Sequence, residues 1–155
     1  MKILVISDSH GNRPAIINAV EKEHPQQVLF LGDGLRDVDV LQEKFPLLPI
    51  LAVPGNCDYG SFDEPERLIE IRGVRILMMH GHTRNVKYGT LSACYAAREA
   101  GAQILLYGHT HRPSVDYDGS LYVMNPGTIG DRARSTYGII TIDGSRVDCS
   151  TYSLL

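Results

Sequence analysis

Five apolar runs of strand length occur along the chain, and each ends abruptly at polar residues. Ile, Leu and Val dominate these runs, which is typical of strands that are buried on both faces. We therefore predict five buried strands, each followed by a polar loop. The segments are ILVISDSH at 3–10, VLFLGDG at 28–34, ILAVPGNCD at 50–58, ILMMHGH at 76–82 and ILLYGHTH at 104–111.

The spacing of these segments favours parallel strands joined by crossovers. The first Asp, Asn or His after each run lies at position 8, 33, 56, 80 or 109, which gives intervals of 25, 23, 24 and 29 residues. A strand, a crossover and the return to a parallel strand fit such intervals. A solenoid would also have a near-constant period, but its loops would repeat one consensus, and these loops do not.

Three helices are predicted between the strands. The first covers residues 12–25, with Asn12 as its candidate N-cap. The second covers residues 35–45. The third covers residues 85–100, and Gly101 is the signal that ends it.

The later part of the chain changes from long crossovers to short turns. Segments of strand character flank Arg72-Gly73, Asp118-Gly119 and Asp143-Gly144. Asp-Gly is a strong hairpin signal, and Arg-Gly is a weaker one. Parallel units followed by hairpins predict an α/β fold with one mixed sheet, or two packed mixed sheets, and helices outside. The length of 155 residues fits a single domain spanning 1–155.

Composition narrows the class of protein and its partners. The chain is 43% hydrophobic and 21% charged, which is ordinary for a soluble globular protein. Its formal net charge is -3 with Lys and Arg scattered, so we do not expect long nucleic acid as a partner. The apolar run at residues 3–6 is too short for a signal peptide, and nowhere do about 18 apolar residues run together. We expect a cytoplasmic protein without a membrane partner.

The three cysteines do not form a recognisable framework. Cys57, Cys94 and Cys149 are odd in number and have no CxxC spacing, which argues against disulfides and against a thiolate zinc site. Cys94 lies in an apolar-periodic stretch and is expected to be a small buried residue. Only Cys57 stands among chemically interesting neighbours, between Asn56 and Asp58.

Potential metal ligands follow all five predicted strands. Because the carboxyl ends of parallel strands gather at one edge of a sheet, we expect these side chains to converge. Each has an ordinary explanation on its own: Asp8 and Asp33 as turn residues, Asn56 as a turn residue with positive φ, or His80 as a hydrogen-bonded histidine. Their joint occurrence favours a metal site. The candidate ligands are Asp8, His10, Asp33, Asn56, His80, His109 and His111, with His82 nearby.

The number of candidate ligands indicates two metals. Six carboxylates and imidazoles, with the Asn56 carbonyl oxygen, exceed what one four-coordinate zinc requires. Two divalent ions about 3.5 to 4 Å apart need a bridging carboxylate, hold a hydroxide at neutral pH and clamp the attacking and leaving oxygens of an in-line displacement at phosphorus. Mixed nitrogen and oxygen ligands accept Mn²⁺, Fe, Co²⁺, Ni²⁺ or Zn²⁺, and manganese is our first expectation.

Five motifs of the chain resemble those of the calcineurin-like metallophosphoesterase superfamily and occur in the same order as in that family. The short length and the Asn125-Pro126-Gly127 segment resemble its small YfcE-type phosphodiesterase branch. The resemblance implies a four-layer α-β-β-α sandwich, and members of this branch often form homodimers. The motifs are Asp8-Ser9-His10, Gly32-Asp33, Gly55-Asn56-Cys57-Asp58, His80-Gly81-His82 and Gly108-His109-Thr110-His111.

The resemblance also implies a division of the ligands between the two metals. His82 receives no ligand role, and we expect it to support a ligand or to contact substrate. Arg112 and Asn12 are candidates for phosphate contacts, although Arg112 is equally well explained as a solvated charge. The implied ligands are Asp8, His10 and His111 for one metal, Asn56, His80 and His109 for the other, and Asp33 as the bridge.

Cys57 is a departure from the family pattern. Many members carry histidine there, with the proposed role of donating to the leaving oxygen while the following Asp, here Asp58, orients it. A thiol is a weak donor with an ordinary pKa of about 8.5, and it has no cationic form. Its weaker protonation of a leaving group should harm monoesters more than diesters with good leaving groups. We predict a phosphodiesterase with Cys57, Asp58 and His82 as catalytic candidates and a small phosphodiester as substrate.

Two other interpretations stay open. The small subunit of retromer has the fold that the resemblance implies and acts as a protein-interaction scaffold, so fold alone does not establish an enzyme. The complete ligand set favours the enzyme. Cys57 would serve as a redox sensor or nucleophile only in a cationic setting that lowers its pKa. Two nearby metals would provide that setting, so regulation by oxidation of the thiol stays open, whereas metal-activated water makes a covalent intermediate unnecessary.

Overall fold

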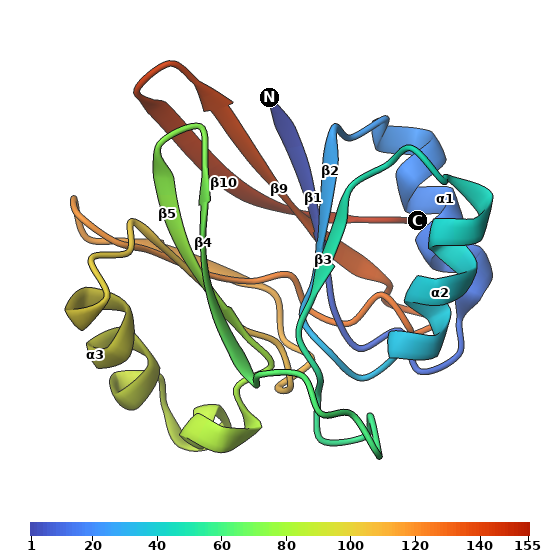
Figure 1. Ribbon diagram of the computed structural model, residues 1–155, viewed down its shortest axis with the longest axis horizontal. Coiled ribbons are helices and arrows are strands. Elements are labelled where there is room, and N and C mark those ends of the chain that lie inside the picture. The colour runs from blue at the N-terminus through green and yellow to red at the C-terminus, as the bar shows by residue number, and fades with distance from the viewer.

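The computed structural model describes residues 1–155 as two five-stranded sheets packed face to face, with helices on both outer faces (Figure 1). The strand order is β10-β9-β1-β2-β3 in the first sheet and β4-β5-β6-β8-β7 in the second. The first sheet contains β1 Lys2–Ile6, β2 Gln27–Phe30, β3 Ile50–Ala52, β9 Thr136–Asp143 and β10 Arg146–Ser153. The second contains β4 Glu66–Ile71, β5 Val74–Met79, β6 Ile104–Leu106, β7 Ser114–Tyr117 and β8 Tyr122–Asn125.

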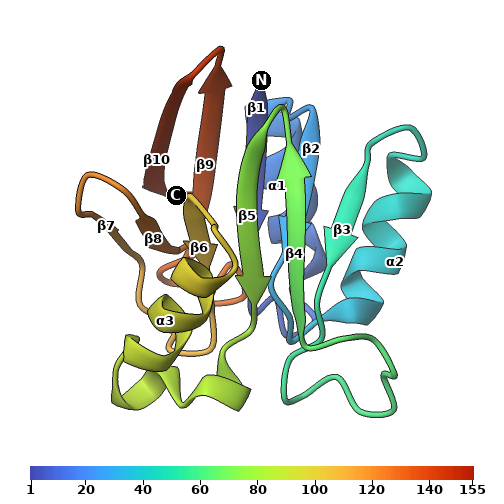
Figure 2. The same cartoon turned by 60° about the vertical axis from the view of Figure 1, so that its left-hand side comes forward.

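Three α-helices complete the predicted four-layer α-β-β-α sandwich. Helices α1 (Arg13–Glu23) and α2 (Leu35–Lys44) cover the outer face of the first sheet, and α3 (Leu91–Glu99) covers the outer face of the second (Figure 2). The sequence-based expectation of two packed mixed sheets is therefore confirmed.

Burial on both faces explains the uninterrupted apolar runs. In β1, Ile3 and Val5 pack into the core between the two sheets, whereas Leu4 and Ile6 pack against the helices. All four side chains are fully buried. Complete burial of such a side chain stabilises the fold by about 1.5–3 kcal/mol, so a polar residue at any of these positions would be costly.

The three predicted hairpins are present. The pairs β4–β5, β7–β8 and β9–β10 are antiparallel, whereas β1–β2, β2–β3, β5–β6 and β6–β8 are parallel. Arg72 and Gly73 form the β4–β5 turn with φ values of 50° and 81°, as a tight hairpin turn requires.

The third helix differs from its prediction over residues 85–100. Two short 3₁₀ turns, η1 (His82–Arg84) and η2 (Val86–Tyr88), precede α3. Gly89 has a φ of 127°, which no helical residue adopts, so the helix begins only after it. Gly101 follows the end of α3 with a φ of 69°, which agrees with its predicted role.

Two smaller expectations also change. Asn12 occupies the N-cap position of α1, but its side chain makes no capping hydrogen bond; it donates instead to the Gly130 carbonyl oxygen at 3.3 Å. Cys94 is half-buried rather than buried, whereas Cys149 lies in the core between the sheets. All three cysteines are free.

The carboxyl ends of the parallel strands of both sheets point to the same side of the molecule. In Figures 1 and 2 the loops that leave β1, β2, β3, β5 and β6 gather along the lower edge of the sandwich. This edge is where the predicted ligands lie. No helix of the chain is both long and apolar enough to cross a membrane.

Candidate metal centre

Asp33 stands between the two groups of predicted ligands. Its Oδ2 atom lies 3.7 Å from His10 Nε2 and 3.3 Å from His80 Nε2. The side chain is only 4% exposed. A single carboxylate oxygen thus faces an imidazole from each group, which is the arrangement expected of a bridging ligand.

The first group consists of Asp8, His10 and His111. Asp8 Oδ1 lies 3.1 Å from His111 Nε2 and 3.7 Å from His10 Nε2. These three residues can offer ligand atoms that all lie within 4.8 Å of one another. Asp8 is fully buried, whereas the two histidine side chains are 40% and 47% exposed, so the group opens to solvent on the histidine side.

The second group is built around His80, which is fully buried. Its Nε2 atom lies 3.0 Å from Asn56 Oδ1 and 3.2 Å from His109 Nδ1. The same nitrogen is 3.8 Å from Asp8 Oδ1, so the two groups are contiguous. All seven predicted ligands therefore belong to one cluster.

The donor atoms of this cluster fit a divalent cation. His80 Nδ1 lies 2.7 Å from the Leu31 carbonyl oxygen and must donate, because a carbonyl oxygen only accepts. His80 Nε2 then faces the oxygens of Asn56 and Asp33 and a nitrogen of His109. A proton on Nε2 can be shared with only one of these neighbours, whereas a divalent cation can bind several of them, and this mixture of nitrogen and oxygen donors suits first-row divalent metals.

The protein's own charges keep Asp33 ionised. Burial by itself raises the pKa of Asp33, but hydrogen bonds from His80 and from the Cys57 backbone outweigh burial and hold the pKa well below its usual range. Burial lowers the pKa of His80, and the carboxylates of Asp33 and Asp8 outweigh that effect and raise it. Burial, followed by the neighbouring His80, lowers the pKa of His109.

Several of the predicted ligands have strained backbones. Asp8, His10, Asp33, His109 and His111 have φ values of 56°, 42°, 61°, 67° and 62°. Non-glycine residues rarely adopt this region, and each instance costs on the order of 1–3 kcal/mol. Asn56 is not among the positive-φ residues, so the explanation of Asn56 as a left-handed turn residue is wrong.

Asp58 positions the backbone around Asp33. Its Oδ2 accepts the N–H groups of Asp33 at 2.7 Å and Gly55 at 2.8 Å, and its Oδ1 accepts those of Gly34 at 2.9 Å and Leu35 at 3.0 Å. Gly34 and Leu35 begin α2, where a carboxylate is favoured by the helix dipole. The carboxylate thus serves backbone amides, whereas we had expected it to orient the side chain at position 57.

Asp37 holds the first ligand loop and was not predicted. It is 3% exposed, and its Oδ2 accepts the Ser9 hydroxyl at 2.6 Å and the Gly11 N–H at 2.8 Å. The guanidinium of Arg13 donates to its Oδ1 at 3.1 Å. Ser9 and Gly11 flank His10, so Asp37 fixes that loop from α2. Nothing in the strand-end pattern points to this residue, which lies in the first turn of α2.

Close packing requires glycine in two of the ligand loops. A Cβ atom on Gly55 would lie 2.1 Å from Asp33 Oδ1. A Cβ atom on Gly108 would lie 2.2 Å from Ser7 Oγ and 2.9 Å from Asp8 Oδ2. The glycines that precede Asn56 and His109 therefore let the loops approach the two buried carboxylates.

Cys57 lies at the edge of the cluster. Its backbone N–H donates to Asp33 Oδ1 at 2.8 Å, and its sulfur accepts from Asn56 Nδ2 at 3.5 Å. The sulfur also lies within 4.8 Å of ligand atoms of His10 and Asp33. Desolvation, followed by the nearby carboxylates of Asp33 and Asp58, raises the pKa of the thiol. The protein's own groups therefore favour the thiol over the thiolate.

His82 lies beside the second group without joining it. Its ring centroid is 5.5 Å from that of His80 and 6.3 Å from that of His109. Its Nδ1 atom is buried and has no hydrogen-bond partner. Burial, followed by the effect of His80, lowers the pKa of His82, so the neutral ring packs against the ligands.

The loop after β8 also contacts the cluster. Thr128 Oγ1 donates to the Asp8 carbonyl oxygen at 2.8 Å, and Gly130 N–H donates to the same oxygen at 3.1 Å. The Ile129 N–H donates to the Ser7 carbonyl oxygen at 3.0 Å. The Asn125-Pro126-Gly127 segment, noted in the sequence, lies at the start of this loop. The contacts of the loop with Ser7 and Asp8 were not predicted.

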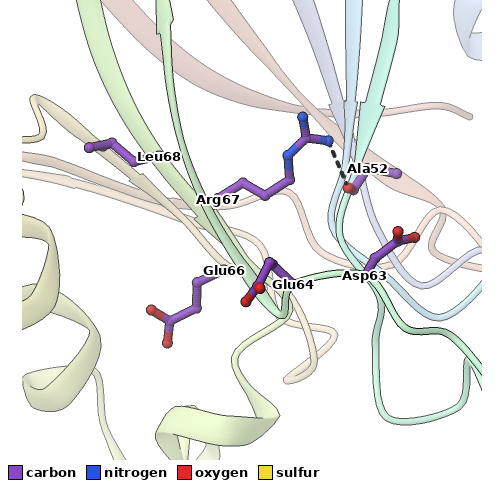
Figure 3. A pocket seen from close by; sticks show the side chains of 6 residues that line it. All are labelled: Ala52, Asp63, Glu64, Glu66, Arg67 and Leu68. Carbon is purple, nitrogen blue, oxygen red and sulfur yellow. Dashed lines mark hydrogen bonds between the residues drawn. The ribbon is translucent and has the colours of Figure 1, made fainter.

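The cavity drawn in Figure 3 is separate from the cluster. It has a volume of about 560 Å³ and lies between the edge strands β3 and β4. The Arg67 guanidinium reaches across it and donates to the Ala52 carbonyl oxygen at 3.3 Å. None of the predicted ligands lines it. The lining residues are Ala52, Asp63, Glu64, Glu66, Arg67 and Leu68.

The two mixed sheets and the Asp/His cluster at their shared edge define a metallophosphoesterase fold. Residues 1–145 match the calcineurin-like phosphoesterase superfamily domain, and the chain belongs to this superfamily. It is 31% identical over 159 residues to the probable metallophosphoesterase YsnB of Bacillus subtilis, a match that covers 98% of this chain and 90% of that protein. It is 26% identical over 153 residues to the phosphodiesterase YfcE of Escherichia coli, covering 83% and 79% of the two chains.

Solved structures agree with this assignment. A predicted phosphoesterase from Streptococcus pneumoniae superposes with a TM-score of 0.82 at 29% identity, covering 99% of this chain and 89% of that one. The zinc complex of Vps29 from Entamoeba histolytica has a TM-score of 0.77 at 23% identity, with 100% of both chains covered. The second likeness shows the fold alone.

Proposed function

We propose that the chain is a two-metal phosphoesterase that hydrolyses small phosphodiesters in preference to phosphomonoesters. The observation that carries this proposal is the position of Asp33 Oδ2 between His10 and His80. One carboxylate that serves two ligand groups is what a pair of metals requires. The name of the relative YfcE, a phosphodiesterase, supports the substrate class.

The residues of the cluster would hold the metals in two sets. When bound, two divalent ions supply positive charge for the phosphate oxygens and lower the pKa of bound water. Manganese is the metal with which we would begin. The proposed ligands are Asp8, His10 and His111 for one ion, Asn56, His80 and His109 for the other, and Asp33 for both.

The chain's other residues position these ligands. Asp58 fixes the backbone of Asp33, and Asp37 fixes the loop that carries His10. Their charge-assisted hydrogen bonds are short and come from backbone amides or a buried hydroxyl, so they leave the ligands little freedom. Because the ligands are already held in place, metal binding has to order fewer side chains and loses less free energy in doing so.

Cys57 is the residue that we propose sets the preference for diesters. Its sulfur lies beside the cluster, and a thiol is a weak hydrogen-bond donor with no cationic form. Such a donor gives little help to a poor leaving group. Diesters whose leaving group has a low pKa need proton donation least, and we therefore expect them to be the favoured substrates.

The alternative function is that of a non-catalytic scaffold of the same fold. The strain in five candidate ligands argues against it, because a scaffold has no use for backbone conformations that cost on the order of 1–3 kcal/mol each. The test compares kcat/KM for bis-p-nitrophenyl phosphate and p-nitrophenyl phosphate after loading with Mn²⁺. A higher value for the diester is expected, and no hydrolysis of either by the metal-loaded protein would support the scaffold.

A further inference from the structure

The loop after β8 is a rigid wall of the proposed site. Besides its bonds to the Asp8 carbonyl oxygen, it is closed at its base by the Ser135 hydroxyl, which donates to the Ile129 carbonyl oxygen at 2.8 Å. A Cβ atom on Gly130 would lie 2.5 Å from the Ser9 carbonyl oxygen. The loop therefore sits directly on the backbone of the first ligand motif.

Two arginines project from this wall without partners. Arg132 and Arg134 are exposed, and neither forms an ion pair or a side-chain hydrogen bond. Asp131 shapes the turn between them and the site, because its Oδ1 accepts the N–H groups of Ala133 at 2.8 Å and Arg134 at 3.1 Å. The turn therefore fixes the backbone that carries both arginine side chains.

Hydrogen bonding places this turn beside the first ligand group, because Gly130, which precedes Asp131, donates its N–H to the Asp8 carbonyl oxygen at 3.1 Å. The backbone N–H groups of Ala133 and Arg134 lower the pKa of Asp131 most, and the charge of Arg134 lowers it further. Arg112 follows His111 directly and is likewise exposed and unpaired. The three arginines and Asp131 thus carry a positive charge in sum, on a chain whose formal net charge is -3.

We propose that Arg132 and Arg134, with Arg112, bind a second anionic group of the substrate, which lies outside the reacting phosphate. This inference rests on the proposed phosphodiesterase function and deepens it. The planar guanidinium group binds phosphate oxygens in pairs, so a phosphate monoester elsewhere on the substrate is the group these residues suit best. The substrate class is a small phosphodiester that carries an additional phosphate.

A long nucleic acid is a poorer match for the same residues. Nucleic-acid binding proteins use stripes or faces of many basic residues. Here Arg112, Arg132 and Arg134 form one small group, and the other exposed cations without a partner lie on separate elements: Arg36, Arg72, Arg75 and Lys87. A few arginines at the rim suffice for one extra phosphate. The expected gain in apparent affinity is about three- to tenfold, which is typical of a few exposed ion pairs.

The test uses two chromogenic substrates that differ by one phosphate. Thymidine 5′-(p-nitrophenyl phosphate) and its 3′-phosphorylated form are compared with the Mn²⁺-loaded protein. The 3′-phosphate should lower KM by about three- to tenfold. In the double variant Arg132→Gln/Arg134→Gln the ratio of the two KM values should fall to about one, and Arg72→Gln, in the β4–β5 turn at the opposite end of the sheet, should keep the wild-type ratio.

A binding measurement separates this inference from the proposed function. Thymidine 3′,5′-bisphosphate is titrated calorimetrically into the metal-loaded wild type and the double variant, and weaker binding by the variant is expected. Equal KM values for the two substrates in the wild type, or equal binding of the bisphosphate by both proteins, would overturn the role of the arginines. Failure to cleave either substrate would overturn the proposed function, while the titration would still decide whether the arginines bind the anion.

Discussion

The carboxylate of Asp58 accepts the backbone N–H of Asp33 at 2.7 Å, so one acidic residue positions another at the centre of the site. Asp58 does so from a different loop, and it also binds the first amides of α2. The Gly-Asn-Cys-Asp motif therefore has two functions in one turn. Asn56 faces the cluster, while Asp58 fixes the neighbouring loop from behind.

Asp58→Ala should weaken both stability and metal binding. Four backbone N–H groups would lose an ionised acceptor, and we expect a loss of about 2–3 kcal/mol in the free energy of unfolding. Metal affinity should fall as well, because Asp33 loses its support. Urea denaturation and metal titration measure the two effects. A variant as stable as the wild type would contradict the positioning role.

Asp33→Asn should lose metal and activity together. The amide keeps the size of the side chain but removes the negative charge that faces both His10 and His80. Elemental analysis after dialysis gives the number of metals per chain, and a diester assay gives the activity. Two metals retained per chain would show that Asp33 is not the bridge.

Asp37→Asn should affect one metal more than the other. Asp37 holds Ser9 and Gly11 on either side of His10, and it forms no hydrogen bond with Asn56 or His109. We expect the first metal to bind about tenfold more weakly, in keeping with the loss of a supporting hydrogen bond. Titration with Mn²⁺ followed by electron paramagnetic resonance resolves the two affinities, and equal weakening of both would contradict the local role.

Cys57→His should raise activity on monoesters relative to diesters. An imidazolium can donate a proton to a poor leaving group, which the thiol with its raised pKa does poorly. The measurement is kcat/KM in both proteins for glycerol 2-phosphate, a monoester with a poor alkoxide leaving group, and for bis-p-nitrophenyl phosphate, a diester with a good one. Cys94→Ser, at a half-buried cysteine on α3, is the matched control and should leave the ratio unchanged. An unchanged ratio in Cys57→His would refute the proposed role of the thiol.

The sequence was informative wherever one strand or one motif carried the signal. Buried strands that end at Asp8, Asp33 and His80 were visible as apolar runs, and the rule that parallel strands share an edge predicted that their loops meet. Distant contacts left no such signal. Asp37 looks like any helical aspartate, and it reaches Ser9 from 28 residues away.

Backbone conformation was the other source of error. The stretch after His82 contains apolar residues at helical spacing, yet Asn85 and Gly89 adopt positive φ and divide it into short turns. Left-handed residues were expected at Asn56 and occur at Asp8 and Asp33 instead. Single-residue propensities do not show which residue tertiary packing will strain.

Metal binding should stabilise the fold through the same residues. A ligand that binds only the folded state raises the free energy of unfolding, by about 2.7 kcal/mol when its concentration is 100 times Kd. Adding Mn²⁺ to chelator-treated protein should therefore raise Tm, and His80→Gln should abolish most of that rise because Nε2 faces both Asn56 and Asp33. The matched control is His24→Asn: His24 caps α1 with a φ of 47°, a conformation that asparagine tolerates, and it takes no part in the cluster. A Tm that responds to Mn²⁺ equally in wild type and His80→Gln would show that the metal binds elsewhere.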